Sequence, residues 1–470
     1  MSTLVLRQAE VDGVLADVRI EGAKVARVEA PGTLAKSHSE IQCHGGALLP
    51  GLHDHHLHLL SMGAALGSID VADDLDRRIR DADAKAPPGV WIRAVNYDET
   101  KGELDRWKLD LLAPARPVRV QHRSGALWVL NSVALGLVGL VGLVGLVGAD
   151  VTTEPGVERD RSGVPTGRLF RLDEWLGLQL RDEGVRNLAE VGRRLAGYGV
   201  TGVTDCTPTS STAYFDTVAD AVRNGELLQT VVVTGGPELS ETLSPEPLER
   251  GPVKIILTDH ELPDMTDLTE WFRRAHRAGR PVAVHCVTRV ALILALAAWR
   301  ETGSIGGDRI EHGSVVPLDI VGDLADLGIT VVTQPGFIWA RGDFYLREVE
   351  RGDQPDLYRC AALIKGGVPV GGSTDAPYGP DDPWLAVRSA IERRAASGAP
   401  VGDDSGLAPQ SALDLFLAPL SDPGGPARRV VPGMTADLCL LDVGLKQALV
   451  DLTSRHVAMT ISGGQTSFVS

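Results

Sequence analysis

Four histidines and one aspartate are concentrated in a short segment near the start of the chain, His53-Asp54-His55-His56-Leu57-His58. A Pro-Gly turn precedes this segment, and its apolar flanks predict a β-strand within 49–59. Side chains two residues apart point to the same face of a strand, so Asp54, His56 and His58 share one face and His53 and His55 take the other. Two imidazoles at this spacing can bind one metal ion. A His-x-His pair alone is weak evidence, so further ligands must come from elsewhere.

Four later residues could supply them, because each stands within or just after an apolar, strand-like run: Lys254, His285, His312 and Asp375. Each has an ordinary structural interpretation. A strand lysine can extend to the rim, a strand histidine is often a hydrogen-bonded core residue, and an aspartate after Ser-Thr can cap a turn. Together they favour a metal site, because metal ligands have to come from several strand ends.

The middle of the chain alternates strand-like runs with helical patterns, as in a parallel α/β fold. Helices are expected at 268–277 and 318–327. Eight strands are predicted, at 49–59, 202–205, 230–233, 253–257, 282–285, 309–312, 329–333 and 368–372. Eight βα units favour a closed TIM-like (β/α)8 barrel, in which the C-terminal strand ends form the active site.

Both ends of the chain contain short alternating strands, at 4–6, 16–20, 25–28, 436–442 and 456–461. This pattern predicts a small β-sandwich domain that both termini build together. The expected fold class is therefore α/β, with a barrel at 51–420 flanked by sandwich segments at 1–50 and 421–470. A long irregular stretch at about 80–190 is predicted to be an insertion after the first barrel strand.

A Gly-Leu-Val repeat runs from Gly136 to Gly148. It covers only about half to two-thirds of the ~20 apolar residues that a membrane-spanning helix needs. Its period of three fits neither a helix nor a strand, so it is interpreted as a slipped-repeat expansion in a connecting region.

Composition narrows the class of protein. The chain has 470 residues and 43% hydrophobic residues, and 46 basic against 62 acidic residues give a net charge of -16. This charge disfavours nucleic acid and anionic membranes as partners. The five cysteines are scattered and contain no Cys-x-x-Cys pair, and the N-terminus does not resemble a signal peptide. We therefore expect a cytoplasmic protein.

The order His-x-His, Lys, His, His, Asp along eight strands resembles the metal-dependent amidohydrolase superfamily. Within it, several motifs resemble the YtcJ-like branch that includes N-substituted formamide deformylase. The resemblance covers nearly the whole chain. The motifs that carry it are 49–59, Gly202-Val203-Thr204-Asp205, Asp308-Arg309-Ile310-Glu311-His312-Gly313, Gly372-Ser373-Thr374-Asp375-Ala376-Pro377 and Pro432-Gly433-Met434-Thr435-Ala436-Asp437-Leu438.

The resemblance implies a divalent metal cofactor, expected to be two Zn²⁺ ions, held by six residues: His56, His58, Lys254, His285, His312 and Asp375. His56, His58 and Asp375 would bind one ion, and His285 and His312 the other. Lys254 would bridge both after carboxylation, since a carbamate offers two oxygens where an ammonium offers none. Asp375 and His312 are also assigned to catalysis, with Asp375 as the base for a metal-bridging hydroxide.

The implied reaction is hydrolysis of a non-peptide C–N bond in an N-acyl or N-formyl amine, a cyclic amide or a carbamate. Trp128, Asp98 and Arg168 are candidates for contact with this small-molecule substrate, although packing is favoured for Trp128. Two alternatives stay open: a mononuclear zinc deaminase, which the threonine at position 288 disfavours because deaminases have a glutamate there, and a non-catalytic binding protein. The split β-domain and the insertion are compatible with a homodimer.

Overall fold

A computed structural model describes residues 3–87, 89–141, 154–180, 187–209, 211–236, 247–259 and 261–470. The chain divides into two compact units, one composed of Met1–Leu59 and Leu188–Ser470 and the other of Leu60–Asn187. Within the described ranges, no helix combines the length and the apolar character that crossing a membrane requires.

The first unit contains every one of the eight expected strands, and they pair in parallel. Together with one further short strand, β15, they form two sheets, with strand orders β15-β14-β13-β6 and β16-β17-β18-β19-β20. The bounds are β6 Leu52–Leu57, β13 Val200–Asp205, β14 Thr230–Val233, β15 Glu249–Arg250, β16 Val253–Ile256, β17 Val282–Cys286, β18 Arg309–His312, β19 Thr330–Thr333 and β20 Val370–Gly372. Main-chain hydrogen bonds also join the two sheets, from Lys254 N to Gly235 O at 2.8 Å and from Asp375 N to His56 O at 2.8 Å.

The first predicted strand is shorter than expected. Leu48–Pro50 forms a separate strand, β5, in another sheet, and β6 begins only at Leu52. Gly51 lies at the junction, where a Cβ atom would come within 2.2 Å of the Thr201 side chain. The chain therefore changes sheets at a position where only glycine fits, which the apolar pattern of 49–59 does not reveal.

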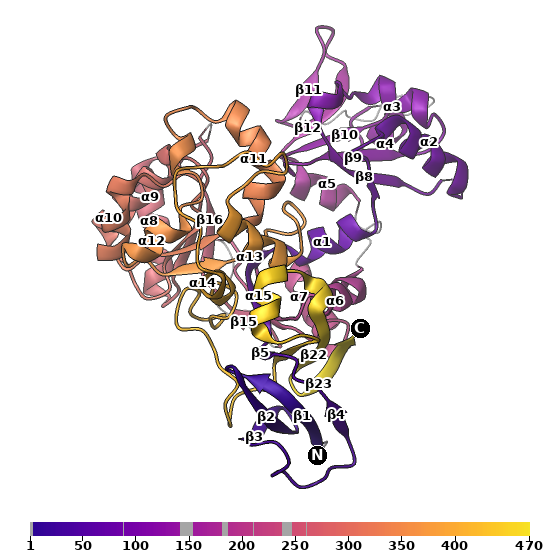
Figure 1. Ribbon diagram of the computed structural model, residues 1–470. Coiled ribbons are helices and arrows are strands. Elements are labelled where there is room, and N and C mark those ends of the chain that lie inside the picture. The colour runs from indigo at the N-terminus through magenta and orange to yellow at the C-terminus, as the bar shows by residue number, and fades with distance from the viewer. Residues whose placement is uncertain are drawn as a thin grey trace. The chain divides into compact units, whose positions relative to one another are not determined.

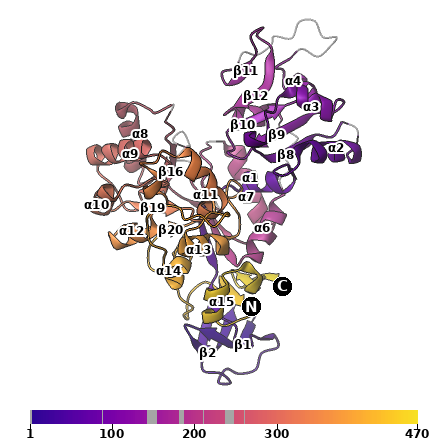
Figure 2. The ribbon, with the colours of Figure 1, turned by 45° about the horizontal axis from the view of Figure 1, so that its top comes forward.

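Helices lie outside the strands, as Figure 2 shows for α8, α9, α10 and α12 beside β16, β19 and β20. Packing between α8 and α9 includes Phe272 and Trp299, whose ring centroids are 5.1 Å apart. The helices of this unit are α6 Leu188–Gly197, α7 Thr212–Arg223, α8 Met265–Arg277, α9 Arg289–Thr302, α10 Val321–Asp326, α11 Gly336–Glu348, α12 Cys360–Lys365, α13 Pro383–Glu392, α14 Pro409–Asp414 and α15 Leu445–Asp451. The helix expected at 268–277 starts earlier, and the one expected at 318–327 begins with a short 3₁₀ turn, Leu318–Ile320.

The two ends of the chain form two further four-stranded sheets, with orders β3-β2-β1-β4 and β23-β22-β21-β5 (Figure 1). One hydrophobic cluster contains residues of both ends, among them Leu6, Ile20, Leu438 and Ile461. The strands are β1 Thr3–Val11, β2 Val14–Glu21, β3 Lys24–Glu29, β4 Glu40–Gln42, β5 Leu48–Pro50, β21 Leu438–Leu441, β22 Val457–Ser462 and β23 Gln465–Val469.

The second unit corrects the expectation of a long irregular stretch, because it contains a six-stranded sheet of order β11-β12-β10-β9-β8-β7. One face of this sheet packs a cluster that includes Ile79, Leu109 and Val120. Its elements are β7 Ile69–Asp70, α2 Leu75–Lys85, β8 Ile92–Tyr97, α3 Arg106–Leu112, β9 Val118–His122, β10 Leu127–Leu130, α4 Ser132–Leu137, β11 Val157–Arg159, β12 Pro165–Phe170 and α5 Asp173–Gln179. Helix α1, Leu59–Leu66, starts at the junction of the units. Charged residues interleaved with the apolar ones obscured these elements in the sequence.

Most of the Gly-Leu-Val repeat, from residue 142 onward, lies outside the described residues.

Asp308 joins the strands that carry His285 and His312. Its buried carboxylate accepts hydrogen bonds from Val282 N at 2.8 Å, Trp299 Nε1 at 2.9 Å and Ile305 N at 2.9 Å. These contacts connect the start of β17, helix α9 and the turn before β18, so this one side chain sets the register of the two strands relative to each other.

We expect Asp308→Ala to lower the free energy of unfolding by at least about 3 kcal/mol, because three buried donors would each lose their acceptor. Urea unfolding followed by circular dichroism measures the change. Asp308→Asn, which keeps one acceptor oxygen, serves as the control and should be less destabilised. An unchanged unfolding midpoint for Asp308→Ala would contradict this account of the strand register.

Candidate metal centre

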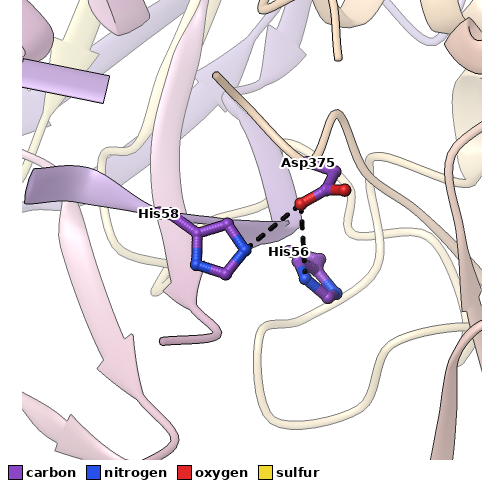
Figure 3. A group of neighbouring side chains, drawn as sticks. All are labelled: His56, His58 and Asp375. Atoms are coloured by element: carbon purple, nitrogen blue, oxygen red, sulfur yellow. Dashed lines mark ion pairs between the residues drawn. The ribbon is translucent and has the colours of Figure 1, made fainter. Parts of the chain in front are cut away.

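Three residues from distant parts of the chain converge at one end of the parallel strands. The Nε2 atoms of His56 and His58 lie 3.6 Å and 3.2 Å from Oδ1 of Asp375 (Figure 3). Their potential ligand atoms all lie within 4.8 Å of one another, close enough to hold one metal ion. His56 is the penultimate residue of β6, His58 directly follows this strand, and Asp375 lies shortly after β20.

The two histidines of β17 and β18 lie beside this group. The ring centroids of His285 and His312 are 4.3 Å apart, and those of His56 and His312 are 4.8 Å apart. His312 Nδ1 also lies 4.0 Å from Asp375 Oδ2. The structure therefore brings all four predicted histidines and the predicted aspartate into one cluster.

Lys254 belongs to the same cluster through its charge, which lowers the pKa of both His56 and His285. The residue is only 1% exposed. Its Nζ atom has no hydrogen-bond partner among the described residues. Burying an amine without a hydrogen-bond partner costs free energy, so a further group is expected to bind this atom.

Burial keeps the imidazoles neutral. Desolvation, with the Lys254 charge, lowers the pKa of His56 to about 4 and that of His285 to about 3. Desolvation and the neighbouring His285 hold the pKa of His312 well below its ordinary value. A neutral imidazole carries a lone pair on one nitrogen, which is the form that binds a metal ion.

Asp375 is an ionised carboxylate despite its burial. Desolvation alone would raise its pKa, but contact with His58, together with the potentials of His56 and Arg341, lowers it. Oδ1 of Asp375 has no hydrogen-bond partner in the described part of the chain. A buried anionic oxygen therefore faces imidazole nitrogens with no proton donor to satisfy it.

Hydrogen bonds behind the histidines determine which ring nitrogen faces the centre. Nδ1 of His56 lies 2.5 Å from Glu311 Oε2, and Nδ1 of His312 lies 2.8 Å from Gln334 Oε1. A carboxylate or amide oxygen can only accept, so both Nδ1 atoms carry the proton and both Nε2 atoms keep the lone pair. Such partners commonly orient metal-binding histidines in proteins.

Glu311 and Arg309 were not predicted from the sequence. Arg309 Nε donates to Glu311 Oε1 at 2.7 Å, and both side chains are buried. Burial opposes ionisation of Glu311, but the Arg309 charge outweighs it and holds the pKa of this carboxyl well below its usual range. The sequence did contain a signal for them, because residues two apart share a face of a strand and positions 309 and 311 place two charged residues on one face of an otherwise apolar strand.

Cys206 forms a second group of potential ligands with His56 and Glu311. Its Sγ atom lies 3.6 Å from Arg309 Nη2 and 3.8 Å from Glu311 Oε1. Burial raises the pKa of the Cys206 thiol well above its ordinary value. Because the guanidinium already neutralises Glu311 and the thiol stays protonated, this group supports His56 and offers no second metal site.

The remaining histidines of the first cluster lie away from the centre. His53 Nδ1 contacts Ala418 O at 2.9 Å, and the buried ring of His55 has no hydrogen-bond partner within the described ranges. Asp54 instead accepts hydrogen bonds from Thr374 N at 3.1 Å and His56 N at 3.2 Å. It therefore connects β6 to the segment that carries Asp375.

Backbone strain also marks this centre. His312 and Asp375 adopt positive φ angles of 74° and 56°, in the left-handed region that non-glycine residues seldom occupy. Such strain costs on the order of 1–3 kcal/mol per residue and is concentrated at functional sites.

The three candidates for substrate contact all lie in the second unit. Trp128 is 4% exposed, and the guanidinium groups of Arg93 and Arg119 lie over its ring at 5.2 Å and 5.6 Å. Asp98 forms an ion pair with Arg123 at 3.2 Å, and Arg168 lies 3.6 Å from Glu158. The packed environment of Trp128 agrees with the packing role favoured from the sequence.

Comparison with known proteins identifies relatives along nearly the whole chain. The amidohydrolase family matches residues 39–468. The chain is 25% identical to N-substituted formamide deformylase of Arthrobacter pascens over 90% of this chain and 89% of the relative. It is 22% identical to the protein YtcJ of Bacillus subtilis (strain 168) over 76% of this chain and 75% of the relative.

The fold is shared with an uncharacterised metal-dependent hydrolase of Pyrococcus horikoshii OT3. The TM-score is 0.75 at 21% identity, and the match covers 97% of this chain and 100% of the other. These matches confirm the resemblance that the strand-end motifs indicated and the prediction of an enzyme. The chain belongs to the amidohydrolase family.

Proposed function

We propose that this enzyme is a metal-dependent hydrolase that cleaves a non-peptide C–N bond in an N-acyl or N-formyl amine, a cyclic amide or a carbamate. One observation carries the proposal: the Nε2 atoms of His56 and His58 converge on Oδ1 of Asp375. Among the described residues, neither this oxygen nor the buried amine of Lys254 has a hydrogen-bond partner. The similarity to N-substituted formamide deformylase supports the bond class.

The donor set fits divalent metal. Neutral imidazole nitrogens and a carboxylate oxygen are ligands for zinc. Without a cation, a buried carboxylate oxygen that faces two lone pairs would be repelled by them. His56, His58 and Asp375 would hold one ion, and His285 and His312 a second.

Lys254 would complete such a pair of sites as a carbamate. Its unprotonated amine would attack carbon dioxide, forming an N–C bond and releasing one proton to solvent, and the carbamate would carry one negative charge shared by two oxygens. The unpartnered, buried Nζ supports this assignment, because a carbamate bound to two cations would satisfy it.

When bound, the metal ions would polarise the scissile carbonyl and lower the pKa of water from 15.7 to about 7. Asp375 would accept the proton of the attacking water at its carboxylate and transfer it to the departing amine nitrogen. His312, held by Gln334, would keep its Nε2 directed at the second metal ion.

The architecture that we propose around this site is a TIM-like (β/α)8 barrel, with the two parallel sheets as one closed ring. The hydrogen bonds from Lys254 N and Asp375 N to the neighbouring sheet support closure. The terminal sheets, at 1–50 and 421–470, would form a β-sandwich around their common core. The barrel would occupy 51–420 and carry the insertion at about 80–190.

The proposal also includes a cytoplasmic location, a homodimer and three residues that contact the substrate. These three residues are Trp128, Asp98 and Arg168. The acidic net charge and the scattered cysteines support the location. Thr288 argues against a deaminase, because it caps α9 and its hydroxyl donates to Asp259 at 2.6 Å. A threonine at this place cannot protonate a ring nitrogen as a carboxylic acid would.

We expect purified wild-type protein to contain about two zinc ions per chain and Lys254→Ala to lose metal and activity together. The reason is that the bridging carbamate would be absent. Elemental analysis measures the metal content, and Lys365→Ala, at the exposed C-terminal end of α12, is the matched control. Full metal content in Lys254→Ala would refute the bridging role, and one zinc per wild-type chain would favour the mononuclear deaminase.

We expect zinc-loaded enzyme to release amines from at least one class among N-formyl amines, N-acyl amines, lactams and carbamates. Asp375→Asn should lower kcat by about 10²–10⁴-fold, since the variant cannot accept a proton. An amine-release assay across these substrates measures both effects. Release of ammonia from ring amines, with no turnover of amides, would overturn the proposed bond class.

A further inference from the structure

A chain of hydroxyl groups lies behind His58, on the side away from Asp375. Nδ1 of His58 is 3.1 Å from Oγ1 of Thr207. The hydroxyl of Tyr214 lies 3.0 Å from the same Oγ1 and 2.5 Å from Oδ2 of Asp205. Three successive contacts thus connect His58 to a carboxylate that is only 1% exposed.

The direction of these hydrogen bonds follows from the carboxylate at their end. Asp205 already accepts from Leu59 N at 3.1 Å and Thr207 N at 2.9 Å, so both of its oxygens act as acceptors. Tyr214 Oη is placed to donate to either Asp205 or Thr207 and has one proton. We assign that proton to the shorter contact with Asp205, so Thr207 donates to Tyr214 and its Oγ1 accepts from His58.

We propose that Thr207 and Tyr214, anchored by Asp205, are positioning residues that keep the proton of His58 on Nδ1 and present its Nε2 as a metal ligand. The inference rests on the proposed function, because it concerns how this chain prepares one side of the proposed metal centre. None of the three residues touches the reacting atoms.

His58 needs such a device more than its neighbours do. Its side chain is 14% exposed, whereas that of His56 is 1% exposed. His58 also lies beyond the end of β6, where its amide donates to Ala376 O at 2.9 Å. Water can compete for its ring nitrogens, and the hydrogen bond that one nitrogen makes decides which tautomer is present.

The same anchor also positions the backbone around His58. Asp205 is the last residue of β13. It accepts hydrogen bonds from the amide of Leu59 and from the hydroxyl of Tyr214 in α7. The carboxylate thus fixes the residue after His58 and the ring of His58 together. A change in the hydroxyl chain should alter metal binding without unfolding the strand.

The test compares zinc affinity in Thr207→Val, Thr207→Ser and Tyr214→Phe, by competition with a chromophoric chelator. We expect Thr207→Val to bind zinc about 10–100-fold more weakly, Thr207→Ser to retain wild-type affinity and Tyr214→Phe to fall between them. Thr217→Val is the matched control, because Thr217 lies on α7 with Tyr214 and its hydroxyl donates to Ala213 O at 2.7 Å.

A second readout follows the proton itself. Zinc-loaded wild-type protein should show a solvent-protected imidazole N–H resonance that disappears in His58→Asn and in Thr207→Val but persists in Thr207→Ser. A structural role of Thr207 alone would lower the thermal midpoint without this selective loss.

The outcomes separate the two proposals. Wild-type protein that binds no zinc overturns the proposed function and this inference with it. Tight zinc binding by wild-type protein with unchanged affinity in Thr207→Val overturns the inference alone. Equal weakening in Thr207→Ser and Thr207→Val also overturns it, because the hydroxyl would then be irrelevant.

Discussion

The structure depends on one electrostatic constraint: a buried carboxylate oxygen faces buried imidazole lone pairs. Oδ1 of Asp375 lies within 3.6 Å of Nε2 of both His56 and His58. In a low-dielectric interior, this arrangement is unfavourable unless a positive charge lies between the groups. Burial lowers the pKa of His56, whereas contact with His58 opposes the effect of burial on Asp375 and lowers the pKa of that carboxyl.

Groups behind the centre hold the lone pairs in place. Glu311, Gln334 and the hydroxyl of Thr207 each contact the Nδ1 atom of a different histidine, so the Nε2 atoms remain directed inward. Arg309 neutralises Glu311, which would otherwise be an uncompensated charge in the core. The site is thus built from two layers, and the outer layer determines the protonation pattern of the inner one.

Strand ends explain how so many separate residues meet. Parallel strands present their carboxyl ends at one edge, and the residues of the centre come from β6, β16, β17 and β18 and from the segment after β20. Asp54 joins β6 to the segment after β20 at this edge, and Asp308 joins β17 and β18 at their opposite, amino ends. Each carboxylate accepts a hydrogen bond from a main-chain amide. The positive φ angles of His312 and Asp375 show that the surrounding contacts impose local strain there.

The sequence predicted the parallel strands well because their signal is local. Continuous apolar runs separated by turns located all eight, and the bounds of β14 and β18 agree to the residue with those expected. The folded second unit was missed, since its strands mix charged and apolar residues, for example Arg93 and Arg119. The change of sheet at Gly51 was also missed, because it depends on the side chain of Thr201, which is distant in sequence.

For the candidate site, residue type and strand position alone indicated His56, His58, Lys254, His285, His312 and Asp375 as the residues to consider. Only the tertiary structure decided that they converge, that the amine of Lys254 lacks a partner, and that Glu311, Gln334 and Thr207 stand behind the histidines. The physical reason is that ligand chemistry belongs to each side chain by itself. Protonation state and tautomer depend on burial and on neighbours that only folding brings together.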